Sequence, residues 1–147
     1  MNKDLNIINR KATHDFNLLE SYVAGIILTG TEIKSVRMGK VNMSDAFCYF
    51  KDGELFVRNM HISDYDRSSF YKHDPKRPRK LLLTKRELKK LNNKVKEKGF
   101  TIAPVRLFLS DTGYAKLEIS LAKGKNTYDK RDSLKEKDLK REMSREQ

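Results

Sequence analysis

Cysteine is nearly absent from the 147-residue chain, in which Cys48 is the single cysteine. One cysteine excludes an intramolecular disulfide and a cysteine-based zinc site, so we expect packing alone to hold the fold. Cys48 stands between Phe47 and Tyr49 in a predicted strand, which favours a buried core thiol.

Long apolar runs are absent as well. The longest aliphatic stretches, 26–28 and 81–83, are far shorter than the ~20 residues that a membrane-spanning helix requires. The first six residues lack the apolar stretch and the cleavage site of a secretory signal. We therefore expect a cytoplasmic protein without a transmembrane helix. At 17.2 kDa it has the size of one domain with a tail.

Catalytic motifs are scarce. His14, His61 and His73 have no histidine partner four residues away and no cysteine companion, which favours structural or RNA-contacting roles over metal ligation. Asp64 and Asp66 could hold Mg²⁺, but a carboxylate pair in a loop is more often a solubilising turn. A glycine-rich phosphate loop and a nucleophile elbow are both missing. The sequence favours a binding protein over an enzyme and predicts no cofactor and no metal.

Acidic residues are the minority charge: 20 Asp+Glu stand against 32 Lys+Arg, a net charge of +12. Residues 72–98 contain 12 basic and 3 acidic residues, net +9, whereas residues 1–71 balance to zero. Residues 123–147 mix basic and acidic side chains evenly, which is typical of a solvated surface. A solvated surface is a poorer explanation for the dense, proline-stiffened run 76–80. Charge at that density repels itself unless an anion relieves it, so a polyanion is the first partner to consider.

Alternating apolar residues predict short strands. Apolar side chains recur at every second position between Phe16 and Leu28, the period of a half-buried strand. Strands over 46–50 and 55–58 flank Asp52-Gly53, a dipeptide that supplies the positive backbone dihedrals of a tight hairpin turn.

A second hairpin is predicted over 101–109 and 114–121, with an edge or a bulge at Pro104. Its return strand alternates aliphatic core positions with an open polar face, formed by Lys116, Glu118 and Ser120.

Two helices are predicted. The spacing of Ile33 and Val36 indicates a short helix over 30–37 that ends before Gly39. Thr84 to Glu87 is a capping box, and the helix that it opens is expected to run to Gly99, with its lysines facing outward. Short strands with one short and one longer helix predict a mainly β fold, an OB-like small β-barrel of a kind that commonly binds nucleic acid.

We expect this barrel to occupy residues 1–122 and a basic tail to occupy 123–147. The tail has too few apolar residues to order by itself, so we predict that it is disordered until bound. Ser133 to Glu136 is nevertheless a capping box in a segment without Gly or Pro, which suits a segment that becomes helical on a partner.

A series of motifs along the chain resembles the small protein B family, the SsrA-binding proteins. The resemblance covers the chain from about Asn9 to the end, and its strength lies in the collinear order of several motifs. They are Asn9-Arg10-Lys11-Ala12-Thr13-His14, Ala24-Gly25-Ile26, the run 30–37, Gly53-Glu54-Leu55, the run 74–83, Gly99-Phe100-Thr101 and the run 124–131.

The resemblance implies an RNA-binding protein of bacterial trans-translation. Such proteins are OB-like barrels that hold the tRNA-like domain of transfer-messenger RNA and escort it, with elongation factor Tu and GTP, to stalled ribosomes. Their tail enters the empty mRNA channel and folds there as a helix. By position, the family's RNA-contacting residues fall on Asn9, Glu32, Lys34, Arg77, Arg79, Lys80, Leu82, Lys116, Lys123 and Lys125. The tail residues at the decoding centre fall on Gly124, Asp129, Lys130, Arg131 and Leu139.

Two of these assignments have structural alternatives. Glu32 repels phosphate, so it would accept from a base amino group or orient Lys34, or it is simply a carboxylate at a helix N-terminus. Leu82 is either a core residue or an apolar side chain exposed to a base. The chain also departs from the family pattern at Val23, Asn126 and Leu139.

Other functions remain open at this point. A general ribosome-associated or single-stranded RNA-binding OB-fold protein is the alternative to the role in trans-translation, and a metal-dependent nuclease is less well supported. A monomer is expected.

Overall fold

The computed structural model describes residues 5–63 and 74–124, which form nine strands and three helices. The strands are β1 (Asn6–Ile8), β2 (Phe16–Ile26), β3 (Val41–Asn42), β4 (Phe47–Lys51), β5 (Glu54–Arg58), β6 (His61–Ile62), β7 (Arg79–Leu82), β8 (Phe100–Leu109) and β9 (Ala115–Gly124). The helices are α1 (Arg10–Asp15), α2 (Gly30–Arg37) and α3 (Lys85–Val95).

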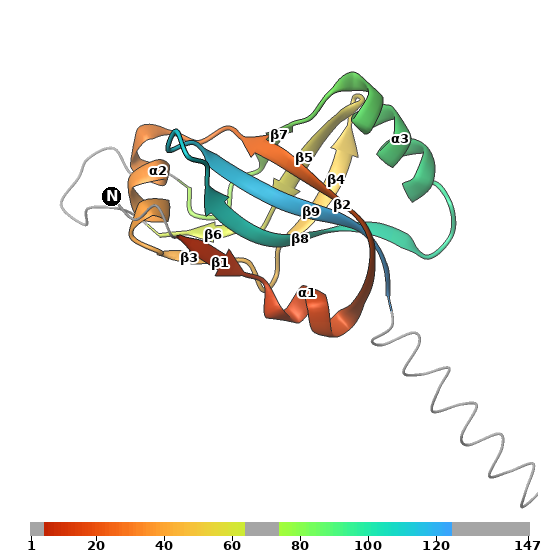
Figure 1. Cartoon of the computed structure of the whole chain (residues 1–147), viewed down its shortest axis with the longest axis horizontal. Coiled ribbons are helices and arrows are strands. Elements are labelled where there is room, and N and C mark those ends of the chain that lie inside the picture. Colours follow the sequence, from red (N-terminus) through yellow and green to blue (C-terminus); the bar gives the residue numbers. More distant parts are fainter. Residues whose placement is uncertain (1–4, 64–73, 125–147) are drawn as a thin grey trace, which may run out of the picture.

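The main sheet closes on itself. Antiparallel neighbours follow in the order β8-β4-β5-β7-β2-β9, and β9 pairs again with β8 along the length of both strands. The closed sheet carries α2 at one end and α3 at the other, and β3 with β6 forms a small separate sheet (Figure 1). The mainly β fold built on a small barrel with a short and a longer helix is confirmed.

The turns and caps predicted from sequence are present. Asp52 and Gly53 have φ values of 53° and 78°, so β4 and β5 are joined by the expected two-residue turn. The backbone N–H of Glu87 donates to the Thr84 hydroxyl over 3.1 Å, and Thr84 N–H donates to the Glu87 carboxylate over 3.0 Å. The expected break at Pro104 is a register shift between Pro104 and Arg106.

The barrel core consists of aliphatic side chains that alternate along the strands. Leu117, Ile119 and Leu121 of β9 are buried as predicted, with Leu55 of β5 and Leu81 of β7. Cys48 is also buried, as predicted, and burial raises the pKa of its thiol.

Ser120 was expected on the open face, and this prediction is wrong because Ser120 is fully buried. Ala12 of α1 packs against Ala103 and Ala122 on the outer side of the barrel. Ser120 pairs with Ala103 and stands two residues before Ala122, so it lies on the same face as these two alanines. Helix α1, which packs on that face, was not predicted.

Several elements were missed or misplaced by the sequence patterns. The short elements β1, α1, β3 and β6 carry no clear periodicity, and β7 begins inside the basic run 76–80, where no strand was predicted. The helix that begins at Thr84 ends at Val95, and Gly99 turns the chain into β8 with a φ of 89°. None of the helices in residues 5–63 and 74–124 is long and apolar enough to cross a membrane.

Candidate RNA interface

The first turn of α2 contains a buried carboxylate. Thr29 and Glu32 form a capping box, in which the Glu32 carboxylate accepts from the Thr29 N–H over 2.8 Å. Glu32 is fully buried, so it needs further partners to stay charged.

Two arginines from the basic run supply those partners. Arg77 Nε donates to one Glu32 oxygen over 2.9 Å and Arg79 Nε donates to the same oxygen over 2.7 Å. Arg79 is itself fully buried and also donates to the carbonyls of Met60 and Pro75, over 2.6 and 3.2 Å. We refer to Glu32, Arg77 and Arg79 as the Glu32 cluster.

The Glu32 cluster is charged because its members compensate one another. Burial alone would raise the pKa of Glu32, but the hydrogen bonds from Arg77, from the Thr29 N–H and from Arg79 outweigh it and lower that pKa. Burial lowers the pKa of Arg79, and the bond to Glu32 opposes this shift. One carboxylate thus neutralises one of two guanidinium groups, and the cluster keeps a net positive charge.

Three predicted RNA-contacting residues are enclosed in the body of the protein. Asn9 caps α1 by accepting from Ala12 N–H, and its amide donates to the Pro104 carbonyl over 2.8 Å. Glu32 and Arg79 are hydrogen-bonded to each other within the Glu32 cluster. All three side chains are buried and hydrogen-bonded within the protein, and their contact with RNA stays a prediction. Glu32 lies in the first turn of α2, as expected from its interpretation as a helix N-terminal carboxylate.

The other predicted contacts in the described part of the chain lie at the surface. Arg77 keeps 30% of its side chain exposed while it binds Glu32. Lys34 and Lys123 are exposed, and Lys80 and Lys116 are half-buried. Lys80 lies 3.5 Å from Glu54, and Lys123 lies 5.8 Å from the centre of the Phe100 ring.

Leu82 is exposed and lies near Lys116, another predicted RNA-contacting residue, and near Val23, where the chain departs from the family pattern. Gly25 of β2 pairs with Leu82 of β7 on one side and with Lys116 of β9 on the other. Leu82 and Val23 are 51% and 53% exposed. We call the surface formed by Val23, Gly25, Leu82 and Lys116 the platform.

Gly25 has no side chain and therefore leaves a shallow depression in the platform. A Cβ atom at this position would lie 3.3 Å from the Leu82 Cβ, closer than side chains normally approach. The glycine therefore leaves a shallow floor between an apolar and a cationic side chain. Sequence analysis identified Leu82, Lys116 and the unusual Val23 but not that they adjoin one another.

The platform continues onto β8, which sequence analysis missed. Arg106 Nε donates to Glu118 over 2.7 Å, and its guanidinium lies 4.1 Å above the centre of the Phe108 ring. Phe108 is the cross-strand partner of Lys116, and Glu118 is the partner of Val23. The alternation of polar residues along β8 and β9 was the sequence signal that could have indicated Arg106 and Glu118 as surface residues.

A second basic surface lies on α3, at the other end of the barrel (Figure 1). Leu91 is buried, and Leu88 and Val95 pack against the core on the same side of the helix. The opposite side is exposed and carries Lys85, Arg86, Lys89 and Lys90, with Lys96 just beyond the helix. Lys90 Nζ lies 3.7 Å from Glu20, and this exposed pair contributes little to stability.

The remaining predicted positions are strand residues or fall outside the described ranges. Gly124 ends β9 and pairs with Phe16, so Lys123 and Gly124 are barrel residues in this structure. The predictions for Lys125, Asp129, Lys130, Arg131 and Leu139 lie outside the described residues, as do those for Asp64, Asp66 and His73. No group of three His, Cys, Asp or Glu side chains within 5–63 and 74–124 is arranged to hold a metal ion.

Comparisons with known proteins bear on the family of this chain. A family model described as SmpB protein matches residues 6–147. The SsrA-binding protein of Bacteroides thetaiotaomicron is 55% identical over 141 residues, which cover 96% of this chain and 94% of the relative. The SsrA-binding protein of Cytophaga hutchinsonii is 57% identical over 143 residues, which cover 97% and 94%. A solved structure described as "tmRNA-SmpB: a journey to the center of the bacterial ribosome" has a TM-score of 0.71 at 46% identity and covers 84% of this chain and 86% of its own. The chain therefore belongs to the SmpB protein family.

Proposed function

We propose that this protein is an RNA-binding protein of trans-translation, which binds the tRNA-like domain of transfer-messenger RNA (SsrA RNA) and delivers it to stalled ribosomes. Relatives that match nearly the whole chain are named SsrA-binding proteins, and the similar solved structure is described as tmRNA-SmpB at the ribosome. The observation that carries the proposal is the platform.

The platform combines the two kinds of contact that RNA recognition needs. Leu82 and Val23 offer apolar surface to a base or a sugar, and Lys116 beside them offers a charge to a phosphate. The low floor at Gly25 lets an RNA strand approach the backbone. Lys34 of α2, Arg77 before β7 and Lys80 of β7, the strand that contains Leu82, add positive charge.

The rest of the proposal concerns the tail and the partners. Residues 125–147 enter the empty mRNA channel of the ribosome and become helical there, with Asp129, Lys130 and Arg131 at the decoding centre, next to Gly124, and Leu139 on the helix. Lys123 and Lys125 contribute to RNA binding at the base of the tail. The protein acts as a cytoplasmic monomer without cofactor or catalysis, and elongation factor Tu with GTP joins through the RNA.

A gel-shift titration tests the RNA partner. The full chain should bind the tRNA-like domain more tightly than an ordinary tRNA of equal length. Equal affinities would favour the alternative of a general RNA-binding protein. Cleavage of the RNA in the presence of Mg²⁺ would contradict a purely binding role.

A pair of variants tests the platform. Leu82→Ser should weaken binding of the tRNA-like domain about tenfold, because burying an aliphatic side chain contributes about 1.5 kcal/mol or more. Met38→Ser is the matched control, since Met38 is 56% exposed and lies outside the platform. If the two variants bind alike, with unchanged circular dichroism spectra, the platform is not the interface.

The tail is tested by replacing Asp129, Lys130 and Arg131 together by Ala. Affinity for the tRNA-like domain should stay within about 1 kcal/mol of the wild type, whereas tagging on stalled ribosomes should lose most of its product. Normal tagging, or loss of RNA binding, would contradict this division of labour.

A further inference from the structure

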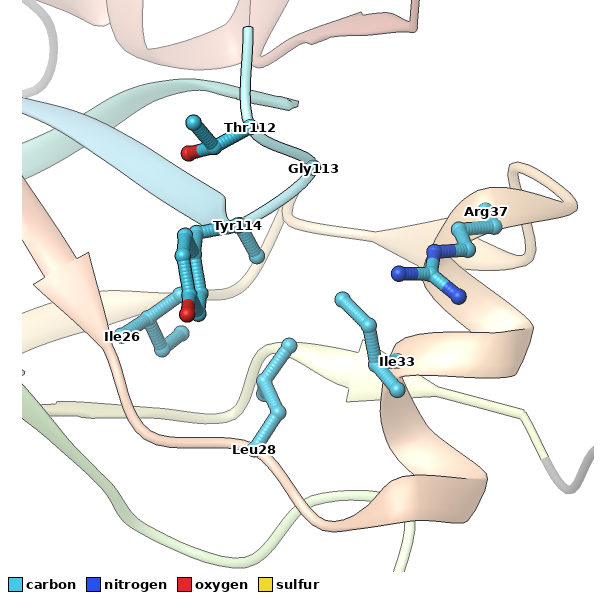
Figure 2. A pocket seen from close by; sticks show the side chains of 8 residues that line it. Ile26, Leu28, Ile33, Arg37, Thr112, Gly113 and Tyr114 are labelled. Atoms are coloured by element: carbon cyan, nitrogen blue, oxygen red, sulfur yellow. The ribbon is translucent and has the colours of Figure 1, made fainter. Parts of the chain in front are cut away.

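A pocket of about 430 Å³ opens between the end of β2, helix α2 and the turn that joins β8 to β9. Figure 2 shows Tyr114 on one side, the guanidinium of Arg37 on the other, and Leu28 and Ile33 between them. None of the predicted RNA-contacting residues within 5–63 and 74–124 lines it. Its volume falls within the ~300–1,000 Å³ typical of small-ligand sites.

The lining is mainly apolar, with an unusually exposed aromatic side chain at its edge. Ile26 is buried, and Leu28 and Ile33 pack partly against the core, so they form a fixed floor. Tyr114 is 70% exposed, so packing within the protein does not account for an aromatic residue at this position. Its ring is available to stack against a planar group.

Arg37 lacks a partner that its burial would call for. Its Nε is buried and has no hydrogen-bond acceptor within the described part of the chain. Arg77 and Arg79, by contrast, each direct Nε to the Glu32 carboxylate. An unsatisfied buried donor costs about 1–3 kcal/mol. Because the Arg37 guanidinium lines the pocket, a bound anionic oxygen would accept from its accessible N–H groups rather than from the buried Nε.

We propose that this pocket binds a single unstacked nucleotide of an RNA partner, with its base on the apolar floor beside Tyr114 and its phosphate at Arg37. This inference rests on the proposed function in RNA binding and deepens it. A planar base has a π-face for the Tyr114 ring, and a phosphate matches the forked donors of a guanidinium. Among the residues that the structure describes, the pocket lining contains no carboxylate that would repel the phosphate.

The pocket and the platform lie one residue apart along two strands. Ile26 follows Gly25 in β2, and Ala115 precedes Lys116 in β9; Ile26 and Ala115 both line the pocket. Successive residues of a strand face opposite sides of the sheet, so an RNA strand on the platform reaches the pocket by passing over the end of β2 and the start of β9. Because the floor is aliphatic, we expect little preference among the four bases.

The variant Tyr114→Trp gives a direct reporter, because the chain contains no tryptophan. We expect the fluorescence of the introduced indole to be quenched when the full-length variant is titrated with the tRNA-like domain or with purified ribosomes. The two titrations distinguish transfer-messenger RNA from ribosomal RNA as the source of the nucleotide. Phe47→Trp is the control, since Phe47 is also exposed and lies outside the pocket.

Affinity measurements separate the two halves of the pocket. For the RNA that quenches the indole, we expect Tyr114→Leu to weaken binding about tenfold and Tyr114→Phe to bind within twofold of the wild type. Arg37→Gln should weaken binding about tenfold and lower the salt dependence by about one phosphate. Lys40→Gln, which removes an exposed charge near the same end of the protein, should cost about twofold.

Two failures are distinguishable. If the wild type binds neither RNA, the proposed function fails and the pocket proposal fails with it. If the wild type binds RNA but the indole at position 114 is not quenched and Arg37→Gln behaves like Lys40→Gln, only the pocket proposal is overturned. Circular dichroism of each variant confirms that the fold is intact.

Discussion

The basic run of residues 72–98 contributes to two regions that use their charge in opposite ways. In the Glu32 cluster, Arg77 and Arg79 bind one buried carboxylate, and Arg79 has no exposed surface. On α3, the lysines opposite Leu91 face solvent, and Lys90 makes only a long contact with Glu20. The comparison shows that a dense run of positive charge in a sequence does not measure the charge that a partner can reach.

The chemistry of the two side chains explains the division. A guanidinium offers planar forked donors and is weakly hydrated, so it can be buried against a carboxylate and backbone carbonyls. An ammonium is strongly hydrated and stays in water while its stem covers apolar surface. Arg77 and Arg79 therefore bind the buried Glu32 at one end of the barrel, whereas the lysines of α3 and the exposed Arg86 remain accessible to solvent.

The largest expected effect is on stability in the Glu32 cluster. Glu32→Ala should lower the free energy of unfolding by about 3–5 kcal/mol, because it leaves the buried Arg79 without its counter-charge. Glu54→Ala, which removes the partly exposed partner of Lys80, should change it by less than about 1 kcal/mol. Urea unfolding of both variants measures the difference, and similar losses would contradict the contrast between buried and surface pairs.

Acid should weaken the Glu32 cluster. The pKa of Glu32 is lower in the folded protein than in the unfolded chain, so its contribution to stability is complete above the unfolded value of about 4.3. That contribution is lost as the pH falls through the folded value. The stability difference between the wild type and Glu32→Gln should therefore shrink below about pH 4. A constant difference from pH 7 to pH 3 would show that Glu32 does not titrate in this way.

The two capping boxes should contribute different amounts to stability, because only one of them positions a buried charge. Thr84→Ala removes a solvent-exposed cap of α3 and should cost about 1 kcal/mol. Thr29→Ala should cost more, because the Thr29 hydroxyl holds the turn that positions Glu32 for both arginines. Thermal unfolding of the two variants compares them, and a larger loss for Thr84→Ala would contradict the coupling.

The smallest effect on stability is expected on α3. Lys89→Gln with Lys96→Gln should leave the free energy of unfolding within about 0.5 kcal/mol, because both side chains are exposed. If α3 lies against RNA phosphates, the same variant lowers the slope of log affinity against log salt by about two phosphates. An unchanged slope would show that only the end with the Glu32 cluster and the platform contacts RNA.

Local sequence signals determined much of this protein. The Asp52-Gly53 turn, the Thr84–Glu87 capping box and the alternation of β9 depend on residues within a few positions of one another, so their patterns predict structure directly. The net charge likewise indicated a polyanion, and the collinear motifs indicated the family. Ser120 shows the limit of such signals, since it is fully buried although Lys116 and Glu118, on the same face of the strand, are partly exposed.

Only the tertiary structure decided which charged residues are accessible and which side chains form one surface. Glu32 meets Arg77 and Arg79 across 45 and 47 positions of sequence, and the platform joins residues from β2, β7 and β9. The pocket between Arg37 and Tyr114 arises in the same way, from α2 and a distant turn. Such contacts depend on which strands the closed sheet brings together. Local periodicity in the sequence does not show which distant strands become neighbours.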